Sequence, residues 1–132
     1  MTVLLDTNII SELVRPEPNV GVLAWRSSIS RIFISAITLD EISYGLTAKP
    51  NLRVQALCDR LLKTDCEVLP ITAEIARLAG ELRGQLRRHG KPRTQADMLI
   101  AATARVHQLT LVTRNLRDFE DCQIQLFDPF RS

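Results

Sequence analysis

Short apolar runs alternate along the chain with longer segments in which apolar residues recur every three or four positions. Short runs with β-branched residues are typical of buried strands, and the wider spacing is typical of helices with one apolar face. The predicted strands are 3–5, 31–37, 67–69, 110–113 and 123–127. The predicted helices are 19–27, 38–49, 52–63, 72–88 and 96–106, with a turn or short helix at 115–119. This alternation predicts a three-layer α/β/α fold with a mainly parallel central sheet, in a single domain at 1–132.

Length and composition narrow the class of protein. The 132 residues, of which 45% are hydrophobic and 24% charged, are enough for one buried core and too apolar for a disordered chain. The apolar runs fall well short of the ~20 residues that span a membrane, and the acid at position 6 comes too early for a signal peptide. We therefore expect a cytoplasmic protein without a membrane partner. Three cysteines without a close pair fit thiols in a reducing compartment better than disulfides or a zinc ribbon.

Several acidic side chains fall at the ends of predicted elements. Asp6 directly follows the first strand, and Glu41 and Asp97 are expected in the first turns of two helices. Asn115 and Asp118 follow the predicted strand at 110–113. Because ligands of open parallel sheets bind beyond the carboxyl ends of the strands, these five residues are candidates for one site.

Helix capping is the alternative explanation for each acid taken alone. Asp6 is a suitable N-cap, and both Thr38-x-x-Glu41 and Thr94-x-x-Asp97 match the capping box. The joint pattern favours more than capping, because Asp97 begins a helix that is apolar almost all round, where an unpaired carboxylate is costly.

A divalent cation would relieve the repulsion among clustered carboxylates. Hard oxygen ligands select Mg²⁺ or Mn²⁺, so we predict a metal site formed by Asp6, Glu41 and Asp97. No arrangement of His or Cys competes with it, since His89 and His107 are isolated in the sequence.

The distribution of basic residues is more informative than the formal net charge of +2. The basic side chains that concentrate in the second half of the chain are Arg83, Arg87, Arg88, Lys91, Arg93, Arg114 and Arg117. A basic surface beside an acidic metal site suits cleavage of a polyanion, although a solvated helix face explains the same charges equally well.

Four sequence blocks resemble the PIN-domain toxins of the VapC type. They are LLDTNIISEL at 4–13, ISAITLDEISYG at 34–45, ADMLIAATA at 96–104 and LVTRNLRDF at 111–119. The blocks occur in the family order, and the resemblance extends from Val3 to Phe130.

The resemblance implies a PIN-like fold and a Mg²⁺- or Mn²⁺-dependent ribonuclease that cleaves RNA. It further implies a small antitoxin protein as partner and a homodimer bound to two antitoxin chains. The family acids fall on Asp6, Glu41 and Asp97, and the fourth family position falls on Asn115, where family members have Asp or Asn. Whether Asp118 replaces it is left open. Thr7, Asn8, Ser11, Thr113 and Arg114 lie in the matching blocks and are interpreted as positioning groups.

Two other functions are alternatives to the nuclease. A phosphoryl-transfer domain of the receiver or haloacid-dehalogenase type is disfavoured, because Asn8 stands where the latter needs a second Asp and no Lys follows the 110–113 strand. A catalytically weak partner-binding or regulatory module of the same fold remains an alternative, since Asn115 removes one negative charge. The apolar residues Ile10, Leu13, Val14 and Trp25 are predicted to form either an antitoxin groove or part of the core.

Overall fold

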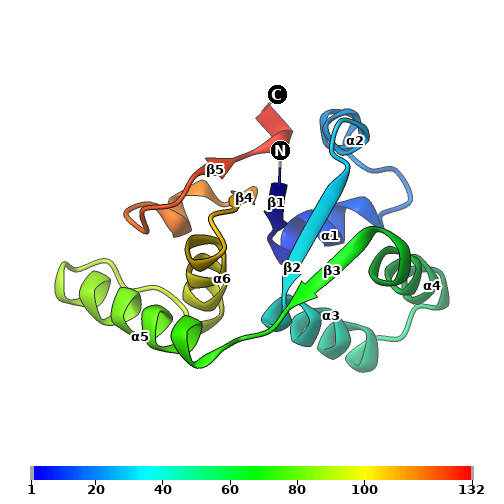
Figure 1. Cartoon of the computed structure of the whole chain (residues 1–132). Coiled ribbons are helices and arrows are strands. Elements are labelled where there is room, and N and C mark those ends of the chain that lie inside the picture. The colour runs from blue at the N-terminus through cyan, green and yellow to red at the C-terminus, as the bar shows by residue number, and fades with distance from the viewer. Residues whose placement is uncertain (1, 132) are drawn as a thin grey trace.

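A parallel sheet lies at the centre of the molecule. The computed structural model describes residues 2–131. The sheet has five strands in the order β3-β2-β1-β4-β5, and each neighbouring pair is parallel (Figure 1). The strands are β1 (Thr2–Leu5), β2 (Arg31–Ser35), β3 (Cys66–Leu69), β4 (Thr110–Val112) and β5 (Leu126–Phe127). The predicted parallel α/β architecture is confirmed.

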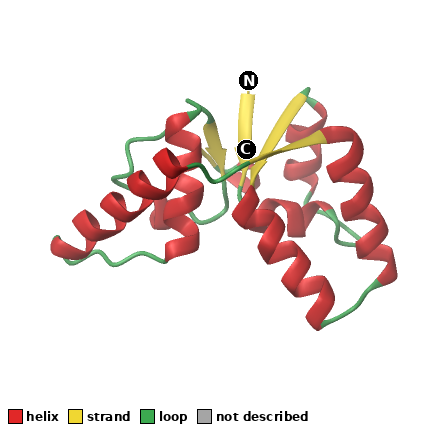
Figure 2. Ribbon diagram, turned by 60° about the horizontal axis from the view of Figure 1, so that its bottom comes forward, coloured by secondary structure: helices red, strands yellow, loops and turns green. Residues whose placement is uncertain are grey.

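Helices flank this sheet on both sides (Figure 2). The α-helices are α1 (Thr7–Leu13), α2 (Val20–Ser27), α3 (Ala36–Ala48), α4 (Leu52–Arg60), α5 (Ala73–Arg88) and α6 (Gln95–Val106). Shorter elements are the π-helical turn η1 (Leu61–Asp65) and the 3-10 helices η2 (Leu116–Phe119) and η3 (Pro129–Arg131). Within residues 2–131, no helix combines the length and the apolar character that crossing a membrane requires.

The strands divide the apolar side chains between two cores. Successive side chains of a strand point to opposite faces of a sheet. Leu4 accordingly packs in the core that includes α5 and α6, whereas Val3 and Leu5 pack in the core that includes α1 and α2. Ile10 and Trp25 are buried in this second core, as the core interpretation predicts.

The position of β1 determines where a site can form. The chain adds β2 and β3 on one side of β1 and returns to add β4 and β5 on the other. The sheet therefore has its topological switch point between β1 and β4, and ligands of open α/β sheets bind at the carboxyl edge beside such a point. Asp6 follows β1 and Thr113 follows β4 at this edge.

The boundary between β2 and α3 differs from the prediction. The strand ends at Ser35 and α3 begins at Ala36, because the Ser35 hydroxyl accepts a hydrogen bond from the backbone N–H of Ile37 and caps the helix. Thr38 is therefore inside the helix, and the predicted Thr38-x-x-Glu41 capping box is wrong. Glu41 lies in the second turn of α3, and not in the first.

The last strand is also shorter than predicted. It covers Leu126–Phe127 only. Asp121 and Gln123 have positive φ angles of 66° and 59°, a left-handed conformation that breaks an extended backbone. The segment before β5 is consequently a set of turns, although its composition had suggested a strand from 123.

Candidate active site

Asp6 lies at the centre of the candidate site. It follows β1 directly and is only 5% exposed. One carboxylate oxygen, Oδ1, accepts a hydrogen bond of 2.8 Å from the backbone N–H of Thr7, which makes Asp6 the N-cap of α1. The other, Oδ2, accepts from the Thr113 hydroxyl at 2.8 Å and from Asn8 Nδ2 at 3.2 Å. Helix capping explains the bond to Thr7 only. The bonds from Thr113 and Asn8 do not cap a helix and instead fix the orientation of the carboxylate.

The Thr113 side chain connects the ends of the two central strands. It is fully buried, and besides donating to Asp6 it accepts a 3.0 Å bond from the backbone N–H of Asn115. Asn8 adds a second link, because its Oδ1 accepts from the backbone N–H of Arg114 at 3.3 Å. The segment after β4 is thus attached to Asp6 and to the start of α1 by the side chains of Thr113 and Asn8.

Glu41 reaches the same edge from α3. Its Oε1 accepts a 2.6 Å hydrogen bond from the Thr7 hydroxyl, and that hydroxyl lies 3.2 Å from Oγ1 of the buried Thr38. Thr7 is the residue next to Asp6, so Glu41 is held one side chain away from it. The contact of Thr38 with Thr7 has no signal in the sequence beyond the place of Thr38 in the second block.

Asp97 lies in the first turn of α6, where it was predicted. Thr94 is the N-cap, and its hydroxyl accepts from the backbone N–H of Asp97 at 3.1 Å. Burial raises the pKa of Asp97 to about 6, and the nearby charge of Asp6 acts in the same direction. Repulsion from Asp118 and Glu41 adds to the shift, whereas a hydrogen bond with Thr94 opposes it.

The acids repel one another across the site. Burial is the main reason that the pKa of Asp6 is raised; repulsion from Glu41 and Asp118 adds to it, against the hydrogen bonds from Thr113 and Thr7. Asp6 and Asp97 therefore both lie within electrostatic range of Glu41 and Asp118, and no basic side chain is among the main influences on either. The site carries negative charge that these protein groups leave uncompensated.

Asn115 and Asp118 differ in their relation to this cluster. Asn115 is exposed, and its side chain does not cap the 3-10 helix that follows it. Asp118 is half-buried in η2 and is the residue whose charge acts on Asp6 and Asp97. The fold therefore brings Asp118 to the acids, whereas only the backbone of Asn115 contacts the site, through Thr113.

The donor set of the site consists of oxygen atoms. Carboxylate and hydroxyl oxygens suit Mg²⁺ or Mn²⁺ and not a soft metal. Within residues 2–131, no three His, Cys, Asp or Glu side chains stand together as a preassembled metal-binding group. The hydrogen bond from Thr7 occupies one oxygen of Glu41, so this acid would have to share or exchange that contact to reach an ion beside Asp6.

Two residues of the predicted basic surface, Lys91 and Arg93, bind other groups of the protein. The Lys91 ammonium forms an ion pair of 2.7 Å with Asp121. The Arg93 guanidinium donates to backbone carbonyls of η2. Arg114 differs from them, because it is exposed beside the site and its guanidinium carbon lies 4.5 Å from the centre of the Phe130 ring.

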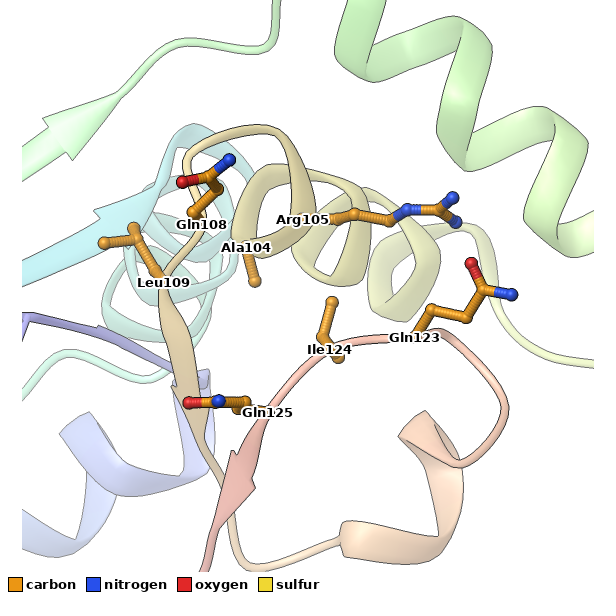
Figure 3. Close-up of a pocket in the computed structure, with 7 residues that line it drawn as sticks. All are labelled: Ala104, Arg105, Gln108, Leu109, Gln123, Ile124 and Gln125. Carbon is orange, nitrogen blue, oxygen red and sulfur yellow. The ribbon is translucent and has the colours of Figure 1, made fainter.

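One hollow of the surface adjoins the acids and another does not. A groove between α1, α3 and α4 includes Thr7 and Glu41 in its lining, and its walls are largely apolar, with Ile10, Val14, Ile42 and Leu46 among them. A second hollow is lined by residues at the end of α6 and before β5, including Gln108 and Gln125 (Figure 3). It lies where β4 begins, and none of the candidate acids lines it.

Comparisons with known proteins identify the family to which this fold belongs. A model of the PIN domain matches residues 3–123, so the chain belongs to the PIN domain family. The toxin FitB of Neisseria gonorrhoeae is 35% identical over 136 residues, which cover 97% of this chain and 98% of FitB. The VapC ribonuclease Y4jK of Sinorhizobium fredii is 34% identical over 136 residues, covering 97% of each. The crystal structure of FitAcB from Neisseria gonorrhoeae matches with a TM-score of 0.86 and 35% identity, covering 100% of both chains. The resemblance to VapC-type PIN proteins, inferred from four blocks, is confirmed.

Proposed function

We propose that the protein is a metal-dependent endoribonuclease and the toxin of a toxin–antitoxin pair. The observation that carries the proposal is the group of mutually repelling acids at the switch point, Asp6, Glu41, Asp97 and Asp118. Its similarity to the VapC ribonuclease Y4jK and the toxin FitB over nearly the whole chain supports the same activity and the same role.

The proposed mechanism is hydrolysis of a phosphodiester by an activated water. A bound Mg²⁺ or Mn²⁺ would lower the pKa of a water molecule and neutralise charge on the scissile phosphate. Asp6 would be the fixed ligand, because its two oxygens are already oriented by Thr7 and Thr113. Asp97 would be a second ligand, and Glu41, guided by Thr7, would bind the ion or orient the attacking water. Asp118 would complete the negative charge that attracts the cation.

RNA would contact the exposed basic side chain that lies beside the acids. Arg114 is the cation best placed for a phosphate, because its backbone N–H is bonded to Asn8 next to Asp6 and its side chain rests on Phe130. A guanidinium held against an aromatic ring keeps its donors directed outward and loses less freedom on binding a phosphate.

An antitoxin protein is the proposed regulatory partner. Glu41 is among the residues that line the apolar groove between α1, α3 and α4, so a segment bound along the groove would contact this acid of the site. The homodimer implied by the family resemblance is part of the same proposal. An antitoxin that occupies this groove should lose affinity when Leu46→Asp places a charge in its wall, measured as a rise in Kd.

The deciding experiment is cleavage of a mixed RNA pool by the purified protein with Mg²⁺, Mn²⁺ or EDTA. Wild-type protein should cut RNA with either metal and not with EDTA, and Asp97→Asn should lose at least about 100-fold in rate because one ligand is gone. Full activity of Asp97→Asn would contradict the assignment of the site.

A partner-binding module without strong catalysis is the second candidate. The absence of a preassembled acidic metal group among residues 2–131 and the Asn at position 115 are the observations that favour it. Intact RNA under every metal condition, together with unchanged thermal stability on adding metal, would support this alternative.

A further inference from the structure

Arg93 bridges two segments that carry acids of the site. It lies in the loop between α5 and α6, immediately before the N-cap of the helix that contains Asp97. Its Nε donates to the backbone carbonyl of Asp118 at 3.0 Å, and its Nη2 donates to that of Arg117 at 3.3 Å. A third bond of 3.2 Å runs from Nη1 to the carbonyl of Pro92, in the same loop as Arg93. The guanidinium thus uses all three nitrogens on main-chain oxygens.

These contacts stabilise a segment with little regular structure of its own. η2 has four residues, and its internal bonding includes the 3.1 Å bond from the N–H of Asp118 to the carbonyl of Asn115. Phe119 anchors the end of η2 in the core, where it is 1% exposed. Hydrogen bonds from an ionised donor are stronger than neutral ones, and a planar fork fixes direction as well as distance. Arg93 therefore restricts the rotation of η2 about its anchor at Phe119.

A second link joins the same two segments through exposed side chains. The Lys91 ammonium pairs with Asp121 at 2.7 Å, and the two side chains are 52% and 54% exposed. Exposed ion pairs of this kind contribute little to stability, because water screens them and both side chains lose freedom. Lys91 thus provides a matched comparison, with a cation of the same loop and a partner after the same 3-10 helix.

We propose that Arg93 is a positioning residue of the active site, which holds the carboxylate of Asp118 at a fixed place relative to Asp97 by tying η2 to the start of α6. The hydrogen bonds alone support the part of the proposal that concerns the position of η2. The expected effect on metal binding and catalysis rests in addition on the proposed function. It differs from the role that the sequence suggested for Arg93, because three of the five N–H donors of the guanidinium are already bonded to main-chain carbonyls.

The structural part is tested on the metal-free protein. Hydrogen exchange of the amides of residues 116–121 should be faster in Arg93→Ala than in wild-type protein by about tenfold or more, whereas Lys91→Ala should change it little. Arg93→Lys should restore only part of the protection, since an ammonium cannot span the two carbonyls of η2 as a fork does. Equal exchange in Arg93→Ala and Lys91→Ala would overturn the proposal.

The functional part is tested by metal affinity and by separating kcat from KM. Arg93→Ala should weaken Mn²⁺ binding, measured by titration calorimetry, by about 10-fold, the range for losing a group that orients a metal ligand. Its kcat should fall with KM unchanged, and methylguanidinium added to Arg93→Ala should restore part of both losses. A raised KM would instead make Arg93 an RNA contact and overturn the proposal, if the slope of log KM against log salt concentration also fell by about 1, the value for one lost phosphate contact. If wild-type protein neither binds Mn²⁺ nor cuts RNA, the proposed function fails, and the exchange experiment still decides the bridge.

Discussion

At the scale of single residues, the hydroxyl of Thr113 determines how Asp6 is held. It is fully buried, donates to the Asp6 carboxylate and accepts from the backbone of Asn115. Removing a partner from a buried charged group leaves that group unsatisfied, which costs more than the bond itself contributes. Thr113 therefore affects both stability and the ionisation of Asp6.

Thr113→Val keeps the shape of the side chain and removes the hydroxyl. We expect the free energy of unfolding at pH 7 to fall by about 1–3 kcal/mol, measured by urea denaturation. The pKa of Asp6 should rise further, because the Thr113 bond now lowers it. Thr113→Ser keeps the donor and should stay within about 1 kcal/mol of wild type. Equal losses in the two variants would show that the methyl group matters and the hydroxyl does not.

The ionisation of Asp97 should make the metal-free protein less stable at neutral pH. Its pKa is about 6 in the folded protein, raised from 3.8, so between these values the folded state binds more protons than the unfolded state. The stability contributed by the protonated form is therefore lost as pH rises from about 4 through 6. Asp97→Asn should exceed wild type by about 1 kcal/mol at pH 7, a value reduced for the partial exposure of the group, and the difference should vanish near pH 4.

Urea titrations from pH 4 to pH 8 with a chelator present would measure this difference. The comparison between the two proteins isolates Asp97 from other titrating groups, such as Asp6 and Glu12. A gap between them that stays constant with pH would contradict the assigned shift.

The residues of the site were predictable to different degrees. Asp6 and Asp97 could be placed from the sequence, because one follows a buried strand and the other begins an apolar helix. A carboxylate is costly to bury at either place unless it has a function or a partner. The contacts of Thr38 and Arg93 could not, because they depend on how α1 meets α3 and how η2 meets α6. Asp118 was left beside Asn115 as an alternative, since spacing alone does not show which of two residues in a 3-10 turn faces the acids.

At the scale of elements, the ends of α5 and α6 show the same bonding with different residues. After α5, Gly90 has a φ of 75°, with bonds from Gly90 N to Arg87 O and from Lys91 N to Leu86 O. After α6, Gln108 has a φ of 55° and makes the equivalent bond to Arg105 O, followed by one from Leu109 N to Ala104 O. This left-handed turn favours glycine, so Gln108 carries a conformational cost that Gly90 does not.

Exchanging residues at these two turns should change stability in opposite directions. Gln108→Gly should raise the free energy of unfolding by about 0.5–1 kcal/mol, and Gly90→Ala should lower it by about 1 kcal/mol. A Cβ at Gly90 would meet no atom within 4 Å, so the expected loss comes from the backbone conformation alone. Thermal or urea unfolding would measure both changes. Destabilisation by Gln108→Gly would mean that the glutamine side chain makes a contribution beyond its turn.

Element type was more predictable than element boundaries. Apolar spacing gave the order of strands and helices from β2 to β4, because packing against a parallel sheet imposes that spacing. The boundary at Ser35 depended on a side-chain cap that competes with the strand, and the start of β5 depended on two left-handed residues. Helix α1 is not predicted from the sequence. Asp6, Thr7 and Asn8 at its start are residues that favour turns as well as helix caps.

At the scale of the whole molecule, the carboxyl edge collects negative charge from segments far apart in the chain. Asp6, Glu41, Asp97 and Asp118 come from four different parts of the sequence, and the strand order around β1 brings them together. A cation that binds only the folded arrangement must stabilise it.

Mg²⁺ or Mn²⁺ should therefore raise the melting temperature, and EDTA should reverse the rise. At a concentration 100 times the Kd, the added stability is about 2.7 kcal/mol. Asp97→Asn should lose most of this gain. Gly90→Ala removes no acid, so it should start from a lower melting temperature and show the full gain. Differential scanning fluorimetry with and without metal would measure it. An equal rise in Asp97→Asn would place the ion elsewhere.

The bond between Asp6 and Thr113 spans 107 positions of the chain. Contacts of such separation form late, because the intervening chain must first be closed into a loop. During synthesis, the ribosome would have to produce β4 before the first acid of the site finds its buried partner. A nascent or truncated chain that stops at Leu109 contains Asp6, Glu41 and Asp97 yet lacks the strand that orients Asp6. We therefore expect the acidic site to become organised only after the ribosome has produced β4.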